Sequence, residues 1–321
     1  MGKNHVRNIM ELSNYYEYVG CFDESWQNAK SIQDRYGAEV FPDGDSLMSR
    51  TNAVVIAAPS YLHRKYGEMA IKHNKHALIE KPLALTEADG ASLKYGFEHI
   101  NKVLSVGHVE RYNPVVTEMK KILLDENEII AIEARRCSPF DARIADTNVV
   151  FDLMIHDLDI VLNYLQPSSL ASFHAEAIIV NSKNHCDFVQ ALIKHNSGAI
   201  SNIVASRVTE DKIRMINVHT KQAYIQGDLL NKSLTLTRKT NLKLDIGYTP
   251  TYKQENIIEK IILPNIEPLK AELMEFAHAI NDKRQPLTDG NDAVKSLGIA
   301  ERISSSVSNC PHLAAAGDAN G

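Results

Sequence analysis

Four short polar side chains recur along one apolar stretch of the sequence, residues 149–165, in which Asp157 is the one other polar residue. They stand at i, i+4, i+7 and i+11 and are Asp152, His156, Asp159 and Asn163. At 3.6 residues per turn, such positions fall within an arc of roughly 60° on a helix. A surface helix is the alternative, but its polar face is usually wider and carries long charged side chains. A buried histidine between carboxylates has a shifted pKa that proton transfer can use. We therefore predict that this helix turns a polar edge into a cleft.

An acidic residue follows the first predicted strand. Residues 15–22 have the aromatic and β-branched composition of a strand, and Asp23 comes directly after them. In an open parallel sheet, a carboxylate at this position accepts hydrogen bonds from the ribose diol of a dinucleotide. An aspartate there repels a 2′-phosphate, which favours NAD over NADP. The alternative interpretation is that Asp23 caps the helix that follows.

Two further strand ends carry residues that could face the same crevice. The predicted strand at 76–80 leads into a Glu-Lys-Pro sequence, and proline holds the preceding residue extended, so Lys81 projects from the strand end. A lysine at a strand end also commonly reaches only solvent. The predicted strand at 53–58 leads into a Pro-Ser turn that contains Ser60 and opens a helix.

The elements that position these residues indicate two domains. Up to about residue 110, short apolar strands alternate with helical patterns, which is typical of a Rossmann-like, doubly wound parallel sheet. Beyond it, long runs of alternating polar and apolar residues predict an α+β domain with a large open, mostly antiparallel sheet. We therefore expect a dinucleotide-binding domain at 1–110 and a second, substrate-binding domain at 111–321.

Composition and charge exclude several classes of protein. The 321 residues carry a formal net charge of −5, which offers no basic field for nucleic acid or anionic lipid. No apolar stretch is long enough to span a membrane, and the N-terminus lacks a signal-peptide core. The four cysteines lie far apart without a C-x-x-C pair, so we expect reduced thiols, no metal site and a cytoplasmic location.

Several of these residues, taken together, resemble a known family. The sequence is similar to the glucose–fructose oxidoreductase/inositol dehydrogenase (Gfo/Idh/MocA) family in residue types, order and spacing over nearly the whole chain. The matching motifs are Met1-Gly2-x-x-His5, Asp23, Ala58-Pro59-Ser60-x-x-His63, Glu80-Lys81-Pro82 and Asp152-x-x-x-His156-x-x-Asp159. Residues 107–114 and 135–153 are most similar to the branch that acts on nucleotide-activated amino sugars, the UDP-N-acetylglucosamine 3-dehydrogenases.

The resemblance implies an activity and an assembly. The expected protein is an NAD-dependent oxidoreductase that oxidises a secondary hydroxyl of a sugar or nucleotide sugar, with the C3 hydroxyl of UDP-N-acetylglucosamine as the first choice. A polyol such as inositol, or glucose, is the alternative substrate for the same reaction. A homo-oligomer, either a dimer or a tetramer, is expected to form through the sheet of the second domain.

By matching position, the resemblance also assigns roles to individual residues. Lys81, Asp152 and His156 form the catalytic set, and the sequence leaves open whether His156 or Lys81 is the base. Asp152 and His156 also contact the substrate, together with Arg111 and Tyr112. The residues expected beside the cofactor are Gly2, His5, Asp23, Ala58, Ser60, His63, Glu80 and Lys81.

The sequence departs from the family pattern at its start. Family members begin with a strand and two further glycines before the position of Gly2, and that strand is central in the sheet. Our interpretation is that the sequence begins at an internal methionine; a truncated form and a degenerate paralogue are the alternatives. A paralogue without the dinucleotide site predicts a different class of function, namely a non-catalytic sugar-binding or regulatory protein.

Overall fold

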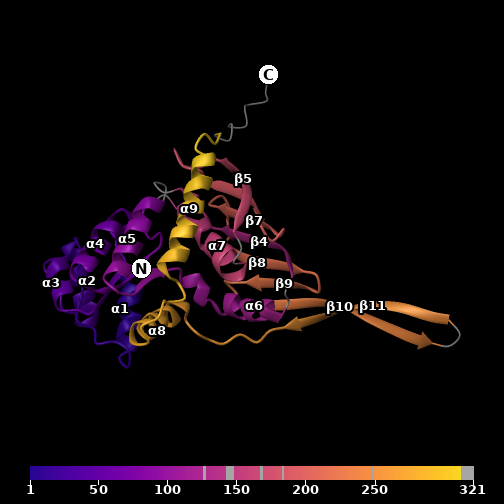
Figure 1. The fold of residues 1–321 in the computed structure, drawn as a ribbon, viewed down its shortest axis with the longest axis horizontal. Coiled ribbons are helices and arrows are strands. Elements are labelled where there is room, and N and C mark those ends of the chain that lie inside the picture. Colours follow the sequence, from indigo (N-terminus) through magenta and orange to yellow (C-terminus); the bar gives the residue numbers. More distant parts are fainter. Residues whose placement is uncertain (126–127, 142–147, 167–168, 183, 247–248, 312–321) are drawn as a thin grey trace, which may run out of the picture. The chain divides into compact units, whose positions relative to one another are not determined.

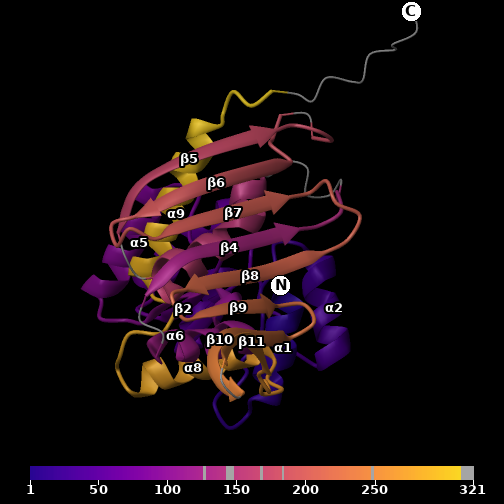
Figure 2. The ribbon, with the colours of Figure 1, turned by 90° about the vertical axis from the view of Figure 1, so that its right-hand side faces the viewer.

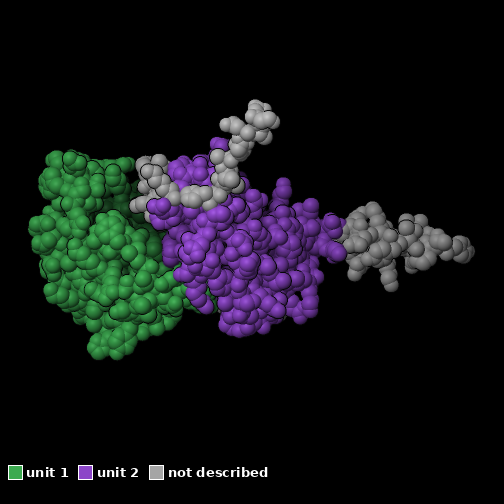
Figure 3. Space-filling model, turned by 90° about the horizontal axis from the view of Figure 1, so that it is seen from above, with its two compact units in different colours: residues 1–112, 266–301 green, residues 113–265, 302–321 purple. Residues whose placement is uncertain are grey.

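The structure is a computed structural model that describes residues 1–125, 128–141, 148–166, 169–182, 184–246 and 249–311 (Figure 1). Of the stretch 135–153 that carries part of the family resemblance, residues 142–147 lie outside the described residues. The chain divides into two compact units, residues 1–112 with 266–301 and residues 113–265 with 302–321, which are green and purple in Figure 3. Each unit is described by itself.

Unit 1 is built on a parallel sheet of three strands in the order β1-β2-β3. The strands are β1 (Ala53–Ile56), β2 (His76–Glu80) and β3 (Leu104–Gly107). Strand β2 is central and its last four residues are buried, as the near-continuous apolar sequence predicts for a parallel strand covered on both faces. The helical elements are α1 (Gly2–Glu11), α2 (Trp26–Tyr36), α3 (Gly44–Ser49), η1 (Ser60–Leu62), α4 (His63–Lys72), α5 (Glu87–His99), η2 (Val109–Tyr112), α8 (Pro268–Asn281) and α9 (Gly290–Ser306).

Local sequence explains where these helices begin and how closely they pack. The Thr86 hydroxyl accepts a hydrogen bond from the backbone N–H of Asp89 at 3.1 Å and thereby caps α5. Helices α4 and α5 pack on each other, and a Cβ at Gly67 of α4 would lie 2.8 Å from the Leu93 side chain of α5. Glycine at this position therefore permits the close approach of the two helices.

The segment 15–22, predicted as a strand, forms no strand in unit 1. Its pairing is a parallel bridge between Cys21 and Val40, in which Cys21 donates to Glu39 and accepts from Phe41, both at 2.9 Å. Strand β1 lies at one edge of the three-stranded sheet, and the segment 15–22 adds no strand to that edge. An extended segment becomes a strand only where a neighbouring backbone offers complementary hydrogen-bonding groups along its length.

The second domain was expected to run from 111 to 321, but residues 266–301 belong to unit 1. Packing decides this: Leu273 and Phe276 of α8 form a buried cluster with Leu12 and Leu78. The segment before α9 also lies along β3, where Val106 donates to the carbonyl oxygen of Thr288 at 2.9 Å. The helical pattern of the sequence identifies these two helices but not the core into which they pack.

Unit 2 contains an eight-stranded sheet in the order β11-β10-β9-β8-β4-β7-β6-β5, visible face-on in Figure 2. All neighbours are antiparallel except β4 and β7. This sheet and the parallel sheet of unit 1 confirm the predicted fold class. The strands are β4 (Ile129–Cys137), β5 (Leu170–Ile178), β6 (Phe188–His195), β7 (Ile200–Ser206), β8 (Ile213–Thr220), β9 (Ala223–Asp228), β10 (Ser233–Ile246) and β11 (Thr249–Lys260).

Helices cover one face of this sheet, as Figures 1 and 2 show together. They are α6 (Pro114–Asp125) and a continuous helical run made of η4 (Val150–Met154), α7 (Ile155–Asp159) and η5 (Ile160–Leu165). Alternation along β6, where Val189, Ala191 and Ile193 are buried and the residues between them are not, places the core between the sheet and these helices.

The helical run differs from the prediction in its geometry. Only α7 is α-helical, whereas η4 and η5 are π-helical, and the run ends with the N–H of Gln166 donating to Val161, five residues earlier, at 3.0 Å. The 60° arc predicted from 3.6 residues per turn therefore does not describe the whole run, because a π turn contains more residues. Sequence periodicity does not report such a local widening.

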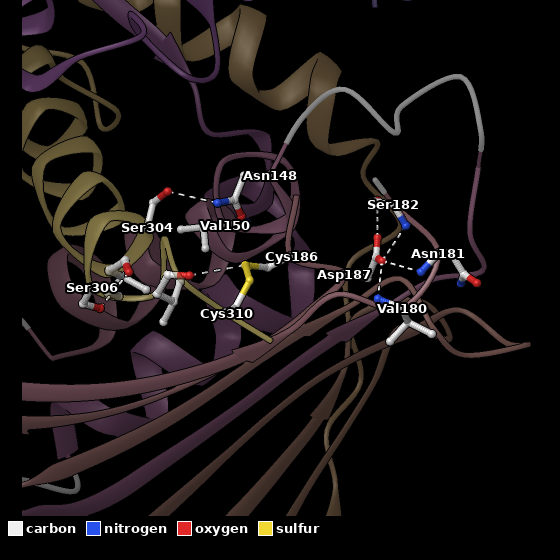
Figure 4. The surroundings of a disulfide bond; sticks show 12 residues. Asn148, Val150, Val180, Asn181, Ser182, Cys186, Asp187, Ser304, Ser306 and Cys310 are labelled. Atoms are coloured by element: carbon white, nitrogen blue, oxygen red, sulfur yellow. Dashed lines mark hydrogen bonds between the residues drawn. A yellow bond between two sulfur atoms is a disulfide. The ribbon is translucent and has the colours of Figure 1, made fainter. Parts of the chain in front are cut away.

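The expectation of four reduced thiols is wrong for two of them. Cys186 and Cys310, 124 residues apart in the sequence, form a disulfide in unit 2, while Cys21 and Cys137 are free (Figure 4). The turn before β6 and the end of α9 meet there, and spacing along the sequence does not reveal such a meeting. Among the described residues, every helix is too short or too polar to cross a membrane.

Candidate active site

A cavity of about 1290 Å³ lies within unit 1. It is lined by the first turns of α1, the extended segment 15–22 and the residues that follow β1. Four of the predicted cofactor residues line this cavity: Gly2, His5, Asp23 and Ala58. Ser60, His63, Glu80 and Lys81 are not part of its lining.

The first turn of α1 contributes residues 1–6 to the lining of this cavity. The N–H groups of Asn4 and His5 bond to the Met1 carbonyl, and those of Gly2 and Lys3 precede them in the first turn. A Cβ built on Gly2 meets nothing within 4 Å, so the backbone is open on that side. A helix start of this kind attracts anionic groups such as phosphate.

Asp23 stabilises the turn before α2, and its carboxylate also borders the cavity. Its Oδ1 accepts hydrogen bonds from the Ser25 N–H at 2.8 Å and from Asn28 at 3.3 Å, which stabilises the turn into α2. The residue is nevertheless exposed and lines the cavity. Because both bonds use Oδ1, the second carboxylate oxygen remains available to a ligand hydroxyl.

A buried pair joins α1 to the end of β2. The Nε2 of His5 lies 2.7 Å from Oε1 of Glu80, and both side chains are buried. Burial alone would raise the pKa of Glu80, but the hydrogen bond and charge of His5, with the charges of Lys81 and the N-terminal amine, lower it. Glu80 is therefore ionised, and it is hydrogen-bonded to His5, which lines the cavity.

His63 and Lys81 follow neighbouring strand ends in different environments. The ring of His63 is buried, with Nδ1 2.7 Å from the Pro82 carbonyl oxygen and Nε2 2.9 Å from that of Ala58. It thus connects the segments that follow β1 and β2, and a neutral ring can donate only one of the two bonds. Lys81 is half-buried and precedes Pro82 across a cis peptide bond.

In unit 2, the helical run carries the other candidate residues. Asp152 and His156 are half-buried, and Nη2 of Arg207 donates to Oδ2 of Asp152 at 3.1 Å. Asp159 is buried and accepts a hydrogen bond from Asn163 at 3.1 Å. The polar edge therefore separates into an accessible part, with Asp152 and His156, and a buried part.

Arg111 and Tyr112, which are predicted to contact the substrate, make internal contacts in unit 1. Both are buried in unit 1, where Arg111 donates to the Leu287 carbonyl at 2.6 Å and to Asp292 at 2.9 Å. The Tyr112 hydroxyl lies 3.3 Å from that of Thr288, and burial raises its pKa. These contacts hold the segment before α9 against η2, which is a structural role.

Sequence analysis missed Arg207 and Arg136, which both contact the helical run. Arg136 of β4 pairs with Asp157, the polar residue off the predicted edge. An arginine that ends or follows a strand is usually exposed, so neither position suggested a buried partner. The isolated Asp157 was the available signal, because a carboxylate on an apolar helix face needs a cationic partner.

Comparison with known proteins places this arrangement in a family. The model of the Gfo/Idh/MocA oxidoreductase family, described as an NAD-binding Rossmann fold, matches residues 1–108. A UDP-N-acetylglucosamine 3-dehydrogenase from Acidithiobacillus ferrooxidans is 27% identical over 305 residues, which are 94% of this chain and 93% of that protein. The family model thus matches the nucleotide-binding part of this chain, and the similarity to the dehydrogenase extends over nearly all of it.

Two further similarities support the family assignment. The solved structure of the Acidithiobacillus ferrooxidans enzyme matches this chain with a TM-score of 0.86 and 26% identity, over 96% of this chain and 94% of that one. An inositol 2-dehydrogenase from Rubrobacter xylanophilus is 31% identical over 166 residues, 50% of this chain and 48% of that protein. The NAD-binding match and the dehydrogenase relatives show that the protein is an oxidoreductase whose cofactor is NAD.

Proposed function

We propose that this Gfo/Idh/MocA protein is a dehydrogenase that oxidises the C3 hydroxyl of UDP-N-acetylglucosamine with NAD. The observation that carries the proposal is the extent of similarity to the Acidithiobacillus ferrooxidans enzyme, which runs through both units. The inositol 2-dehydrogenase matches only half of the chain. Similarity beyond the nucleotide-binding part favours the nucleotide sugar, because that part of the chain carries Asp152 and His156, which we propose to contact the substrate.

The cavity of unit 1 fits the dinucleotide that this reaction requires. The start of α1 offers N–H groups for a phosphate, and Asp23 offers a carboxylate oxygen for a ribose diol. Gly2 and Ala58 present small side chains to the same cavity. In the bound state NAD supplies the hydride acceptor, and these residues hold it without taking part in the transfer.

The catalytic set in this proposal is Lys81, Asp152 and His156. Oxidation of a secondary alcohol releases the hydroxyl proton, and histidine is the side chain that most often accepts such a proton, which favours His156 as the base. Asp152 orients the imidazole or accepts a hydrogen bond from the sugar. The ammonium of Lys81 stabilises the developing alkoxide, and an exchange of roles between Lys81 and His156 gives the same proton balance.

Purified protein tests this function directly. We expect NADH formation at 340 nm with UDP-N-acetylglucosamine, and weaker or no activity with myo-inositol or glucose. His156→Ala and Lys81→Met should each lower kcat by about 10²–10⁴-fold, the usual contribution of a general acid or base, with little change in the melting temperature. Activity that survives both substitutions would exclude this catalytic set, and turnover of inositol alone would exclude the substrate.

Assembly and location complete the proposal. We place the oligomer interface on the face of the eight-stranded sheet that the helices leave uncovered (Figure 2). Leu192 and Ile200 on this face are 51% and 45% exposed, a partial apolar surface that a second copy can cover. We also propose a cytoplasmic location; the disulfide between Cys186 and Cys310 is the observation against it, because such bonds are rare in that compartment.

A further inference from the structure

Arg207 follows β7 and reaches the helical run beneath the sheet of unit 2. Its Nη2 lies 3.1 Å from Oδ2 of Asp152. The Arg207 side chain is 3% exposed and that of Asp152 is 24% exposed. The guanidinium thus approaches from the protein interior, while the carboxylate retains an accessible surface. The buried guanidinium can therefore orient the Asp152 carboxylate while the exposed part of that carboxylate contacts a ligand.

The backbone of Arg207 is fixed by a tightly bonded turn. Its N–H donates to the carbonyl oxygen of Asp187 at 2.7 Å. The buried carboxylate of Asp187 accepts the N–H groups of Val180, Asn181 and Ser182 at 2.8, 2.6 and 2.8 Å, and also the Ser182 hydroxyl (Figure 4). Burial alone would raise the pKa of Asp187, but these hydrogen bonds lower it, so the turn stays bonded at neutral pH.

The same turn anchors the start of the helix that carries Asp152. The N–H of Val149 donates to the carbonyl oxygen of Cys186 at 3.4 Å, one residue before Asp187. Asn148 caps the helix by accepting from the Val150 N–H at 3.0 Å, and its side chain donates to Ser304 at 2.9 Å (Figure 4). Residues 186–187 therefore set the position of both Arg207 and the first turn of the helix.

From this geometry we infer that Arg207 is the positioning residue that orients the Asp152 carboxylate toward the substrate hydroxyl. The inference rests on the proposed role of Asp152. An aspartate on a helix otherwise samples several rotamers, and ordering it before the substrate arrives lowers the cost of reaching a reactive geometry. Arg207 itself stays behind Asp152 and does not contact the reacting atoms.

A second ion pair on the same helix provides a matched control. Arg136 and Asp157 pair through two hydrogen bonds, but both side chains are only 2% exposed, so this pair has no accessible surface. It holds the helix to β4 without facing a ligand. Substitutions at Arg136 and Arg207 therefore share a structural effect, and only Arg207 should also affect substrate kinetics.

The test compares Arg207→Met, Arg207→Lys and Arg136→Lys in the full chain, with UDP-N-acetylglucosamine and NAD as substrates. We expect Arg207→Met to lower kcat/KM for the sugar about 10–100-fold, the scale of a misplaced catalytic group, without changing KM for NAD. Arg207→Lys should recover part of the loss. Arg136→Lys should lower the melting temperature but leave kcat/KM of the folded enzyme within about twofold. Equal kinetic effects of Arg136→Lys and Arg207→Met would overturn the inference.

A double-mutant cycle separates this inference from the proposed function. In an Asp152→Asn background, Arg207→Met should cause little further loss of kcat/KM, because the oriented group is already altered. A full additional loss would overturn the inference. Absence of turnover by the unmodified enzyme with every sugar tested would instead reject the proposed function. In that case urea unfolding measures the free energy of unfolding of the two single variants and the double variant. Strictly additive changes in this free energy reject the positioning role.

Discussion

Arg136 and Asp157 form a bidentate ion pair in the interior of unit 2. Nε of Arg136 donates to one carboxylate oxygen and Nη2 to the other, each at 2.9 Å. The pair connects β4 to α7. Its geometry satisfies both charges where water cannot, and it explains why an aspartate stands on an otherwise apolar helix face.

Removal of one partner of this pair should destabilise unit 2. We expect Asp157→Asn to lower the free energy of unfolding by about 3–5 kcal/mol, because it removes the carboxylate charge that pairs with the buried Arg136 guanidinium. Urea denaturation followed by circular dichroism measures the change. The combined replacement Arg136→Met and Asp157→Leu should recover most of it, and equal losses in the single and double variants would contradict this explanation.

Glu272 of α8 should oppose folding as the pH rises. In unit 1, all of whose residues are described, the buried carboxyl has no hydrogen-bond partner on either oxygen. Burial, and secondarily the charge of Glu80, raises its pKa well above the ordinary value. The folded state therefore retains a proton that the unfolded state releases. Its contribution to stability is complete below the unfolded pKa of about 4.3 and is lost as the pH rises toward the folded pKa.

The isosteric change Glu272→Gln tests this prediction. It should raise the free energy of unfolding at pH 8 on the order of 1–3 kcal/mol relative to its effect at pH 5, since the amide never ionises. Thermal unfolding at the two pH values gives the comparison. Glu267→Gln, an exposed residue just before the same helix, is the control and should show a much smaller pH-dependent difference. An unchanged pH dependence in Glu272→Gln would refute the prediction.

Reduction of the disulfide should lower the stability of unit 2. Cys186 and Cys310 close a loop of 124 residues, and loss of such a link typically costs about 2–4 kcal/mol. We expect a lower melting temperature in dithiothreitol for the unmodified protein and no effect of dithiothreitol on Cys310→Ser. Mass spectrometry after thiol alkylation should show two modified cysteines before reduction and four after it. Four modified cysteines in the unreduced protein would show that the bond is absent.

Asp23 should contribute to NAD affinity through its ribose contact. Loss of hydrogen bonds to a charged group costs about 1.5–3 kcal/mol, so Asp23→Ala should weaken NADH binding roughly 10–100-fold. Fluorescence titration with NADH measures this change. Asn28→Ala removes a hydrogen bond that Asp23 accepts but keeps the carboxylate, so it is the matched control and should bind NADH nearly normally. Equal weakening in both variants would assign Asp23 to the turn alone.

The sequence by itself determined the local elements and the family. Strand β2 coincides with the predicted residues 76–80, because a short apolar run followed by Lys-Pro leaves few alternatives. The eight-stranded sheet was predicted as large and mostly antiparallel from alternation alone. The motif around Asp152 and His156, with those around Asp23 and Lys81, sufficed for the family and its NAD cofactor. These features depend on residues that are close together in the sequence, or on the order and spacing of short motifs along it.

Only the tertiary structure decided which distant residues meet. Arg207 on Asp152, Arg136 on Asp157 and the bond from Cys186 to Cys310 join segments that are 55, 21 and 124 residues apart. The assignment of residues 266–301 to unit 1, and the burial of Arg111 against Leu287 and Asp292, arise from such meetings as well. Hydrophobic periodicity predicts which face of a helix or strand is buried, but it does not predict which other element packs against that face. That choice depends on packing and charge pairing summed over the whole unit.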